Sequence, residues 1–592
     1  MDATHRRDAS GPAFDASVQD DAASESLDAA QSPDAPDARA PPPDAAPWLD
    51  AATGLDAGGD PDVGGAVDAG ACAPLPDPMG GASTVDLFAQ IGAASVVNSA
   101  WEPLPNYTAT GSTDYEHGGY GLGQSSDQFA DGTHAGPRTF YLLPPSNPSD
   151  FIKIFFPSQS LAPAAAYVFS SKIGIRHVPG STALGVSVHV VVSADPDVAG
   201  EPSWVELAQY SLAKTDTRQL EVPLGLWPLR ANFKLAIQIS CVGNNYYDVV
   251  LLDGASLRPV QPRAALGVNQ PNLMWDSGGV PVMQRRVDQM ASVGAMQLRL
   301  ALRGVGVMSP TLAIIKRANE RGMKVLLNVL HEAEDFVDPL GATANGGAEF
   351  NALCGWPNGN FRLSAVDLPR YRARLTAYVD AIRAQGLTVD AYEIGNEYDW
   401  VCFNGDIPLT GGAPDQSFNA TAARYAEILR ASYEIIHRPG DCRPPAVVTF
   451  GPANTIHFRP SNSIDPVRFF TYLRNVNGVD YLARYADVIG EHIYSSEATN
   501  TADLRAAAQA VPAGKPFWVT EWGVPLSAAS TGYPRYAAMK AVLSLMSSLP
   551  DVRIENSFLY AFEDAQWGVY DTSRDTPLFE ARIFSDYRVP AR

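Results

Sequence analysis

The chain of 592 residues is long enough for roughly two to four domains, and its apolar share of 46% and charged share of 18% are typical of globular proteins. The net charge is −22, of which −13 falls in residues 1–82, and no basic stripe is present to neutralise phosphates, so no nucleic-acid partner is expected. No apolar run of about 18 residues occurs, so no membrane-spanning helix is expected.

Residues 1–82 consist mainly of Ala, Asp, Pro and Gly, as in DAPDARAPPPDAA at 34–46. Such a composition buries too little apolar surface to offset chain entropy, so we predict a disordered, extended spacer, with a functionless extension as the alternative. The opening MDATHRRDASG has no apolar region behind its charges and by itself indicates a cytoplasmic protein. The tail nevertheless resembles the spacer of surface-anchored bacterial proteins, so we expect a secreted or cell-surface tethered protein.

Five cysteines are too few for a disulfide scaffold in a protein of this length. Cys354 and Cys402 either pair across two loops, as fits an oxidising compartment, or are unpaired small apolar side chains. No Cys-x-x-Cys or His-rich pattern indicates zinc, and we expect neither a metal nor a cofactor.

Residues 83–262 alternate short apolar runs with Gly, Pro, Asn and Asp, and no helical pattern lies between the runs. The strand-like runs are FIKIFFP (151–157), YVFSSKIGIRHV (167–178), LGVSVHVVVSA (184–194), FKLAIQISCV (233–242) and YDVVLLDGASLRPV (247–260). This pattern predicts an all-β antiparallel sandwich.

The last of these runs resembles the final strand of jelly-roll carbohydrate-binding modules. Trp101, Tyr107, Tyr115 and Tyr120 would then be candidates for a platform that stacks on sugar rings. In a β-sandwich such aromatics also serve as core or rim residues, and both interpretations remain open.

Residues 263–592 alternate apolar strand-like runs with amphipathic helical stretches, which predicts parallel strands. Eight such runs, seven of them followed by a helix, predict a closed (β/α)₈ TIM barrel. An open doubly wound sheet is the alternative, but no glycine-rich phosphate turn follows the first run. The predicted strands are 264–269, 295–302, 323–331, 389–397, 445–452, 486–495, 516–524 and 555–564, and the predicted helices are 281–293, 310–321, 366–385, 420–437, 465–475, 501–510 and 533–549.

Polar and aromatic residues gather where six of these strands end, which is the face of such a barrel that carries active sites. Any one of them has a structural explanation, whereas their joint placement indicates a site. They are Arg299, His331, Asn396, Glu397, His492, Tyr494, Glu521, Phe562 and Trp567.

Glu397 and Glu521 end the fourth and seventh strands, about three β/α units apart, so we expect them to face each other across the barrel mouth. Carboxyl groups roughly 5 Å apart suit double displacement at an anomeric carbon, with one as nucleophile and the other as acid and base. Their proximity is expected to raise the pKa of the acid relative to that of its partner.

The motifs IGNE at 394–397 and VTEWG at 519–523 resemble the signature of the (β/α)₈ clan A of retaining glycoside hydrolases, most of all family 5, the cellulase and mannanase group. The resemblance covers residues 263–592. It implies Glu397 as acid/base, Glu521 as nucleophile and Asn396 as the residue that binds the substrate 2-hydroxyl. It also implies that Arg299 and Tyr494 orient the nucleophile, while His331 and His492 line the sugar site.

Two positions depart from family 5. Tyr398 stands where that family commonly has proline, and the strand-8 tryptophan position is occupied by Phe562, which leaves Trp567 as the candidate stacking residue. The GNE tripeptide also resembles arabinofuranosidase and glucuronidase families of the same clan.

We therefore expect a retaining glycoside hydrolase that acts on β-glycosidic bonds of a polysaccharide or oligosaccharide, as a monomer. A non-catalytic glycan-binding or adhesion protein is the alternative from another class, although both glutamates and their expected supporting residues are intact.

Other carboxylates near the predicted site are expected to be loop residues: Glu332, Glu334, Asp335, Glu563 and Asp564. Glu491 should point away from His492 and pair with a helix residue, because adjacent side chains on a strand face opposite ways. Glu393 lies about 13 Å deeper than Glu397 on the same face of its strand, and we expect it to pair with Arg299.

Overall fold

A computed structural model describes most of the residues that follow the predicted spacer. Apart from residues 81 and 82, the spacer lies outside the described residues, as do Tyr107 and Tyr115. The described ranges are 81–104, 119–122, 128–129, 131–134, 136–145, 147–176, 185–195, 204–213, 215–242, 249–262, 264–276, 278–410, 417–438, 441, 443–457, 459–526, 532–549 and 551–587. Among the described residues no helix is long and apolar enough to cross a membrane.

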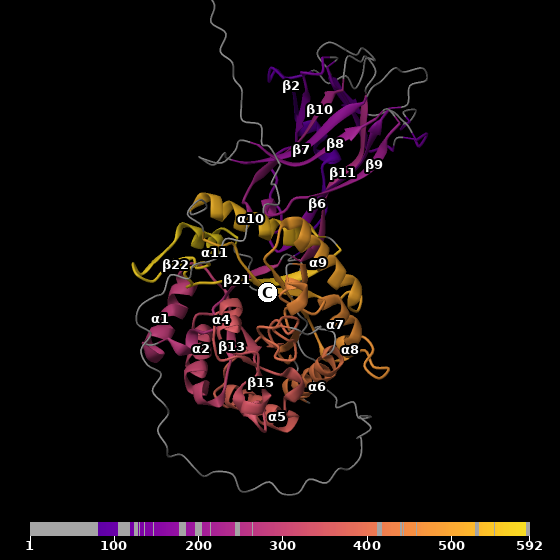
Figure 1. The fold of residues 1–592 in the computed structure, drawn as a ribbon. Coiled ribbons are helices and arrows are strands. Elements are labelled where there is room, and N and C mark those ends of the chain that lie inside the picture. The colour runs from indigo at the N-terminus through magenta and orange to yellow at the C-terminus, as the bar shows by residue number, and fades with distance from the viewer. Residues whose placement is uncertain are drawn as a thin grey trace, which may run out of the picture. The chain divides into compact units, whose positions relative to one another are not determined.

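The first described part, up to residue 262, forms two antiparallel sheets (Figure 1). One sheet has the order β3-β4-β11-β6-β9, with β1 added on β11, and the other has the order β2-β5-β10-β7-β8. The first comprises β1 (Val85–Asp86), β3 (Gly119–Leu122), β4 (Thr139–Leu143), β6 (Ala165–Ile175), β9 (Thr217–Pro223) and β11 (Val250–Pro262). The second comprises β2 (Ser95–Asn98), β5 (Ile152–Phe155), β7 (Val186–Ala194), β8 (Val205–Leu212) and β10 (Phe233–Cys241).

The two sheets share one apolar core, which confirms the sandwich expected from the alternating pattern. Ile152 and Ile154 of β5 and Ile237 and Ile239 of β10 lie in this core, so every second side chain of these strands faces inward. Tyr120 of β3 packs against the same core.

The second part is an eight-stranded parallel barrel, as predicted. The strand order is β18-β17-β14-β13-β12-β21-β20-β19, and a parallel bridge between Val448 and Val488 joins the two end strands. The strands are β12 (Ala265–Asn269), β13 (Gln297–Leu302), β14 (Lys324–Val329), β17 (Ala391–Ile394), β18 (Ala446–Thr449), β19 (Ile489–Ile493), β20 (Phe517–Trp522) and β21 (Ile554–Tyr560). Each is shorter than its predicted range, and several of the polar rim residues lie just beyond the ladders.

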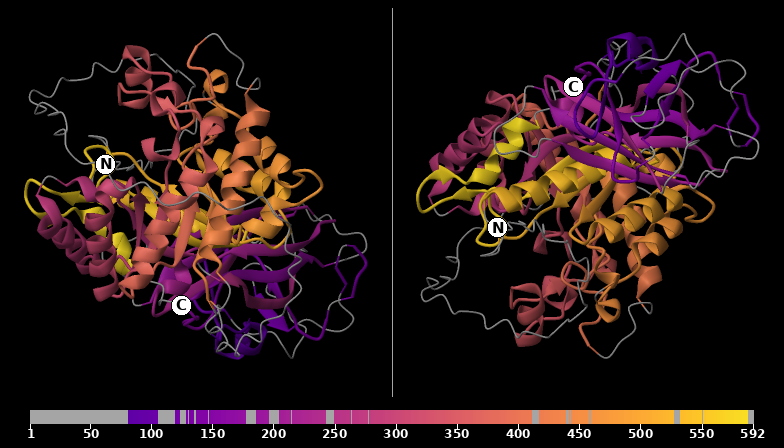
Figure 2. Two further views of the ribbon diagram at one scale, coloured as in Figure 1. Left: turned by 90° about the horizontal axis from the view of Figure 1, so that it is seen from below. Right: turned by 90° about the horizontal axis from the view of Figure 1, so that it is seen from above.

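All seven predicted helices are present and follow one another around the barrel strands (Figures 1 and 2). They are α1 (Gly279–Ser292), α2 (Met308–Glu320), α5 (Leu368–Ala384), α6 (Phe418–Ile436), α7 (Pro466–Leu473), α9 (Glu497–Ala510) and α10 (Tyr533–Ser548). Shorter helices α3 (Pro339–Ala342), α4 (Ala348–Cys354) and α8 (Tyr481–Tyr485) lie in connections, and α11 (Arg582–Asp586) lies near the last described residue.

Side-chain caps mark where several helices begin. Asp367 accepts a hydrogen bond from the Arg370 amide at the start of α5, and Asp465 and Ser496 cap α7 and α9 in the same way. Proline follows the cap at the first turns of α5 and α7, where a missing N–H costs nothing. Each of these helix starts is therefore fixed by its own local sequence.

Candidate active site

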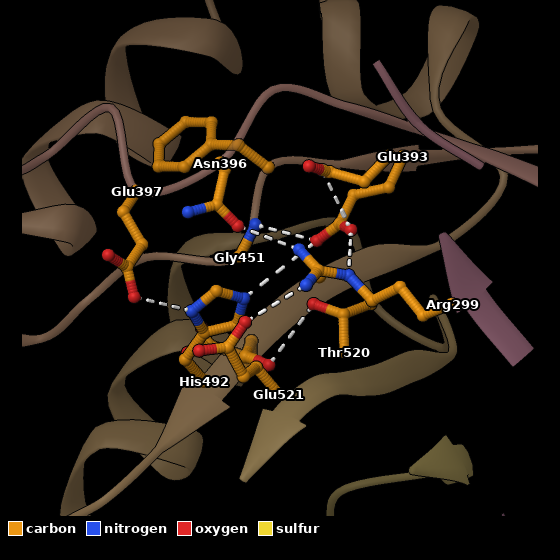
Figure 3. Close-up of polar contacts among 12 residues, drawn as sticks. Arg299, Glu393, Asn396, Glu397, Gly451, His492, Thr520 and Glu521 are labelled. Carbon is orange, nitrogen blue, oxygen red and sulfur yellow. Dashed lines mark hydrogen bonds and ion pairs between the residues drawn. The ribbon is translucent and has the colours of Figure 1, made fainter. Parts of the chain in front are cut away.

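The two predicted glutamates meet at the rim of the barrel. A carboxylate oxygen of Glu397, a carboxylate oxygen of Glu521 and a ring nitrogen of His492 all lie within 4.8 Å of one another. Figure 3 shows the side chains of His492 from β19 and Glu521 from β20 converging with Glu397 from the loop after β17, together with Arg299. The placement expected from the order of the strands is thus present.

Arg299 of β13 is the buried centre of the site. Its Nε donates to Glu393 Oε2 at 2.6 Å, its Nη1 to Glu521 Oε2 at 2.9 Å and its Nη2 to Asn396 Oδ1 at 2.7 Å (Figure 3). The expected Glu393–Arg299 pair is confirmed, and Asn328 Nδ2 also donates to Glu393, at 3.0 Å. One guanidinium therefore fixes the carboxylate of Glu521 and the amide of Asn396 relative to each other.

Glu521 is surrounded by donors and positive charge. Tyr494 donates to Oε1 at 2.7 Å, and Asn269 donates to Oε2 at 2.7 Å. Burial by itself would raise the pKa of Glu521, but the charges of His492 and Arg299 and the two hydrogen bonds outweigh it and hold that pKa below its ordinary value. Glu521 is therefore kept ionised.

Glu397 has the opposite environment. It is 7% exposed and bonds to His492 Nδ1 at 2.9 Å. Burial raises its pKa, the His492 contact offsets part of the shift, and the charge of Glu521 adds to the increase. The pKa of His492 is also raised, because the charges of Glu521 and Glu397 outweigh its burial. The two carboxyl groups thus differ in the direction of their pKa shifts.

Glycine at two positions permits this packing. A Cβ at Gly451, which follows β18, would lie 2.3 Å from His492 Cδ2. Gly395 has φ 95°, and a Cβ there would lie 2.0 Å from the ring of Tyr398. Glu397 itself has φ 49°, in the left-handed region that few non-glycine residues adopt, and its N–H donates to the Gly451 carbonyl at 3.0 Å.

A cavity of about 740 Å³ opens beside the pair. Five of the predicted residues line it: Arg299, His331, Asn396, Glu397 and Glu521. Two tryptophans from different loops, Trp275 and Trp356, form part of its wall, and Trp275 is 50% exposed. Its size is within the range of small-ligand sites.

His331 and Tyr398 form a stacked pair in the cavity wall. Their ring centroids lie 5.1 Å apart with an interplanar angle of 2°, and both residues line the cavity. Burial lowers the pKa of His331, and the Asp335 carboxylate, 3.8 Å from Nδ1, offsets part of the shift. Tyr398, in place of the proline of family 5, thus supplies a ring that supports His331.

The end of strand β21 differs from expectation. Phe562 is buried and stacks on Tyr570 with centroids 4.8 Å apart, whereas Tyr560 lines the cavity. Trp567 packs edge-on against Tyr494 at 5.3 Å and is outside the cavity lining. Trp567 therefore contacts the residue that holds Glu521, and Tyr560 occupies the wall position for which Trp567 was the candidate.

The competing carboxylates each have another structural partner. Glu332 pairs with Arg303 at 2.7 Å, Asp335 with Arg374 at 2.7 Å and Glu563 with Arg286 at 2.5 Å. Glu334 accepts from the amide of Val305, and Asp564 from those of Gln566 and Trp567. None of these five lies in the cluster of Glu397 and Glu521, although Glu332 lines the cavity.

The expectation for Glu491 is wrong in one respect. Its side chain is buried, but it accepts a hydrogen bond from Asn454 Nδ2 at 3.2 Å, and Asn454 lies in the loop after β18 and not in a helix. The loop turns at Asn454, which adopts a left-handed conformation with φ 53°, and this turn brings the amide to Glu491.

Sequence reasoning missed Asn269, Asn328, Tyr560 and Gly451. Asn269 and Asn328 are polar residues within apolar runs, and that pattern was available as a signal. Gly451 and Tyr560 carry no comparable signal, because their importance depends on what the fold places against them.

A disulfide joins Cys354 and Cys402, with Cα atoms 5.5 Å apart. Cys354 ends α4 in the excursion between β14 and α5, and Cys402 follows β17. Both connected loops contribute to the cavity wall, through Trp356 and Phe403 among others. The disulfide therefore links the loop that carries Trp356 covalently to the loop that carries Phe403.

Glu397, His492 and Glu521 are also the ligand types that zinc accepts. These three side chains would be the residues to hold such an ion.

No family model matches the sequence, and no curated protein matches it. Solved structures with similar folds include a β-glycosidase with 14% identity, which covers 56% of this chain and 97% of that one with a TM-score of 0.38. They also include the CBM22-1 and GH10 modules of endo-1,4-β-D-xylanase 10B from Clostridium thermocellum, with 10% identity, coverage of 86% and 97%, and a TM-score of 0.37. The endo-1,4-β-mannanase of Rhizomucor miehei has 14% identity, coverage of 55% and 96%, and a TM-score of 0.35. These similarities concern the fold alone.

Proposed function

We propose that the protein is a retaining glycoside hydrolase that cleaves β-glycosidic bonds of a polysaccharide or oligosaccharide. The observation that carries the proposal is the pair of carboxyl groups, with oxygens within 4.8 Å and pKa shifts in opposite directions. Retaining enzymes need a separation near 5 Å, whereas inverting enzymes leave about 6.5–9.5 Å for a water molecule.

In the first step the ionised Glu521 attacks the anomeric carbon, and Glu397 gives its proton to the departing glycosidic oxygen. In the second step Glu397 removes a proton from water, whose oxygen displaces Glu521 and restores the original configuration. Arg299 Nη2 donates to the amide oxygen of Asn396 at 2.7 Å, which leaves the Asn396 Nδ2 group to donate to the substrate 2-hydroxyl.

The charges of the cavity favour a neutral sugar. Arg299 is paired with Glu393 and Glu521, and Arg303 with Glu332 at 2.7 Å, so each arginine in the described lining has a carboxylate partner. A uronic acid would need a cation that is not already neutralised. Neutral β-glucans, mannans and xylans are accordingly the substrates to test first. Arabinans, whose furanosyl units are α-linked, test the arabinofuranosidase-like alternative.

The disulfide supports a secreted or cell-surface tethered location for the enzyme. Disulfides persist in oxidising compartments and are uncommon in the cytosol.

The test is product analysis on a panel of these four polysaccharides, with NMR of the newly formed anomeric centre. We expect retained configuration, and a loss of at least about 10³-fold in kcat for E521A and E397A. E427Q, on the solvent side of α6, is the control that should keep full activity. Azide should restore part of the E397A rate on an activated aryl glycoside and yield a β-glycosyl azide, because the vacated space admits the anion.

Inverted product, or unchanged turnover by both alanine variants, would contradict the assignment. Unchanged turnover would mean that other residues carry out the reaction, whereas no turnover of any polysaccharide by the wild type would favour a glycan-binding role without catalysis.

A further inference from the structure

Lys153 of β5 is almost completely buried, at 5% exposure, although it faces away from the sandwich core. Its neighbours Ile152 and Ile154 occupy the core, so Lys153 lies on the outer face of the five-stranded sheet. Aromatic side chains bury it instead. Its ammonium lies 4.8 Å from the ring centroid of Trp204, 5.5 Å from that of Trp101, and 5.8 Å from those of Phe151 and Phe155.

Lys153 has no carboxylate partner among the described residues. Burial lowers the pKa of Lys153. Two acidic residues of nearby loops are bonded elsewhere: Glu102 accepts from Asn98 at 3.0 Å, and Asp150 accepts from Ser99 at 2.8 Å. An anion bound from outside would stabilise the charged form of such a buried lysine.

Beside the ammonium, Trp101 presents an open aromatic surface. It is 56% exposed, and its other contacts include a stacked arrangement with Phe155 at 5.8 Å. Its φ of 63° lies in the left-handed region, which is costly for a bulky residue, and its amide donates to the Asn98 carbonyl at 2.9 Å. The tight turn thus holds an indole at the surface, where a sugar ring can stack.

Polar side chains continue from Lys153 across the same face. The strand register aligns Lys153 with Gln238 of β10, then with His189 of β7 and Gln209 of β8. His189 is paired with Glu206, and Gln209 Nε2 donates to Ser187 Oγ at 3.3 Å. Both glutamine amides carry further donor and acceptor capacity. A chain of hydroxyl-bearing units laid across the strands would meet all of them.

We propose that this face binds an acidic polysaccharide, with one sugar ring stacked on Trp101 and the carboxylate of that unit, or of its neighbour, at Lys153. The site does not use the barrel residues and does not depend on the proposed hydrolase activity. The net charge of −22 opposes non-specific binding of a polyanion, so binding would depend on local contacts such as Lys153.

The test is affinity electrophoresis of the full-length protein in gels that contain polygalacturonate, alginate or the neutral hydroxyethylcellulose. We expect wild type to be retarded by at least one of the two acidic polymers and much less by the neutral one. K153Q and W101A should each raise the dissociation constant for the polymer, obtained from the retardation, by about tenfold or more. A tenfold change corresponds to about 1.4 kcal/mol of binding free energy.

Lys172 provides a matched control. Its ammonium also lies over an aromatic ring, that of Phe129 at 4.3 Å, but Asp131 is 3.6 Å away. K172Q should therefore bind as wild type does. Melting temperatures of all variants establish that they fold, and E521A should bind the acidic polymer fully, which separates this site from the barrel site.

Three results would each overturn the proposal: no retardation by either acidic polymer, equal retardation of K153Q and wild type, or equal retardation by the neutral polymer. Equal retardation by the neutral polymer would indicate a site that binds sugar rings whether or not they carry a carboxylate.

Discussion

Tyr494 holds the proposed nucleophile through one hydrogen bond, from its hydroxyl to Glu521 Oε1 at 2.7 Å. Y494F removes that donor and leaves the ring against Trp567. Since a hydrogen bond to a charged group contributes about 1.5–3 kcal/mol, the pKa of Glu521 should rise by about one to two units. Glu521 must be ionised to attack, so the acid limb of the kcat/KM profile should move to higher pH.

The pH dependence of kcat/KM for Y494F measures this shift directly. Y481F, on helix α8, is the control and should leave the acid limb in place. An acid limb that stays at its wild-type position in Y494F, with only kcat reduced, would mean that Tyr494 does not set the ionisation of Glu521.

Asp399 lies two residues beyond Glu397 and is fully buried. It accepts hydrogen bonds from the amides of Ala453 at 2.8 Å and Asn454 at 3.2 Å, so it holds the loop after β18 against the loop that carries Glu397. Burial raises the pKa of Asp399 to about 7, and the charge of Glu397 adds to the shift. Asp399 therefore positions these two loops and changes its ionisation near neutral pH.

The raised pKa of Asp399 has a consequence for stability. A carboxyl group whose folded pKa exceeds its unfolded value stabilises the fold fully below the unfolded pKa, near 4, and loses that contribution as pH rises to about 7. The loss is at most about 1.4 kcal/mol per pH unit in this window. D399N should therefore show a shallower fall in the free energy of unfolding between about pH 4 and pH 7.

Urea unfolding at several pH values tests this, and the difference between D399N and wild type isolates Asp399 from other buried carboxyls such as Glu491. D380N, which removes a surface partner of Arg438, should keep the wild-type slope. A D399N slope equal to that of wild type would show that Asp399 does not titrate in this range.

At the scale of elements, the apolar runs of the sequence were sufficient to predict all eight barrel strands and seven helices, because buried parallel strands and amphipathic helices have distinct periodicities. The site followed from one topological rule, that strand ends converge. The remaining features could not be predicted, because they depend on which residues the folded chain brings into contact. Gly451 is needed because His492 packs directly against it. Tyr560, and not Trp567, lies in the cavity wall, which the sequence pattern does not indicate.

The Cys354–Cys402 disulfide connects two loop elements that carry cavity walls. In C354S/C402S we expect a loss of about 2–4 kcal/mol in stability, because the cross-link constrains the unfolded chain. We also expect a higher KM with little change in kcat, since Trp356 and Phe403 lie in the cavity wall. Glu521 is held by Arg299, Tyr494 and Asn269, and Glu397 contacts His492, none of which is a disulfide residue.

Melting temperature and steady-state kinetics with and without reductant measure both effects. Wild type under reduction should approach the double variant, whereas the double variant should not respond to reductant. A fall in kcat equal to the rise in KM would show that the disulfide positions the reacting carboxylates as well as the wall.

The whole molecule combines a proposed neutral-sugar hydrolase with a proposed acidic-glycan site in one polypeptide. If both proposals hold, binding through Lys153 and Trp101 raises the effective concentration of the barrel near any neutral polymer that is mixed with the acidic one. K153Q should then slow release of sugar from a composite gel of polygalacturonate and the preferred neutral glycan. The same variant should hydrolyse a short soluble oligosaccharide at the wild-type rate, because no second site is engaged.

Reducing-sugar release from the composite gel, from the neutral glycan alone and from the oligosaccharide gives the three rates to compare. K172Q should match wild type on all three, since its lysine is paired with Asp131. Raising the salt concentration should diminish the advantage of wild type over K153Q on the composite gel, because screening weakens the contact with the polyanion. An equal loss for K153Q on all three substrates would instead mean that Lys153 supports the fold of the sandwich and that the two parts of the protein do not act together through it.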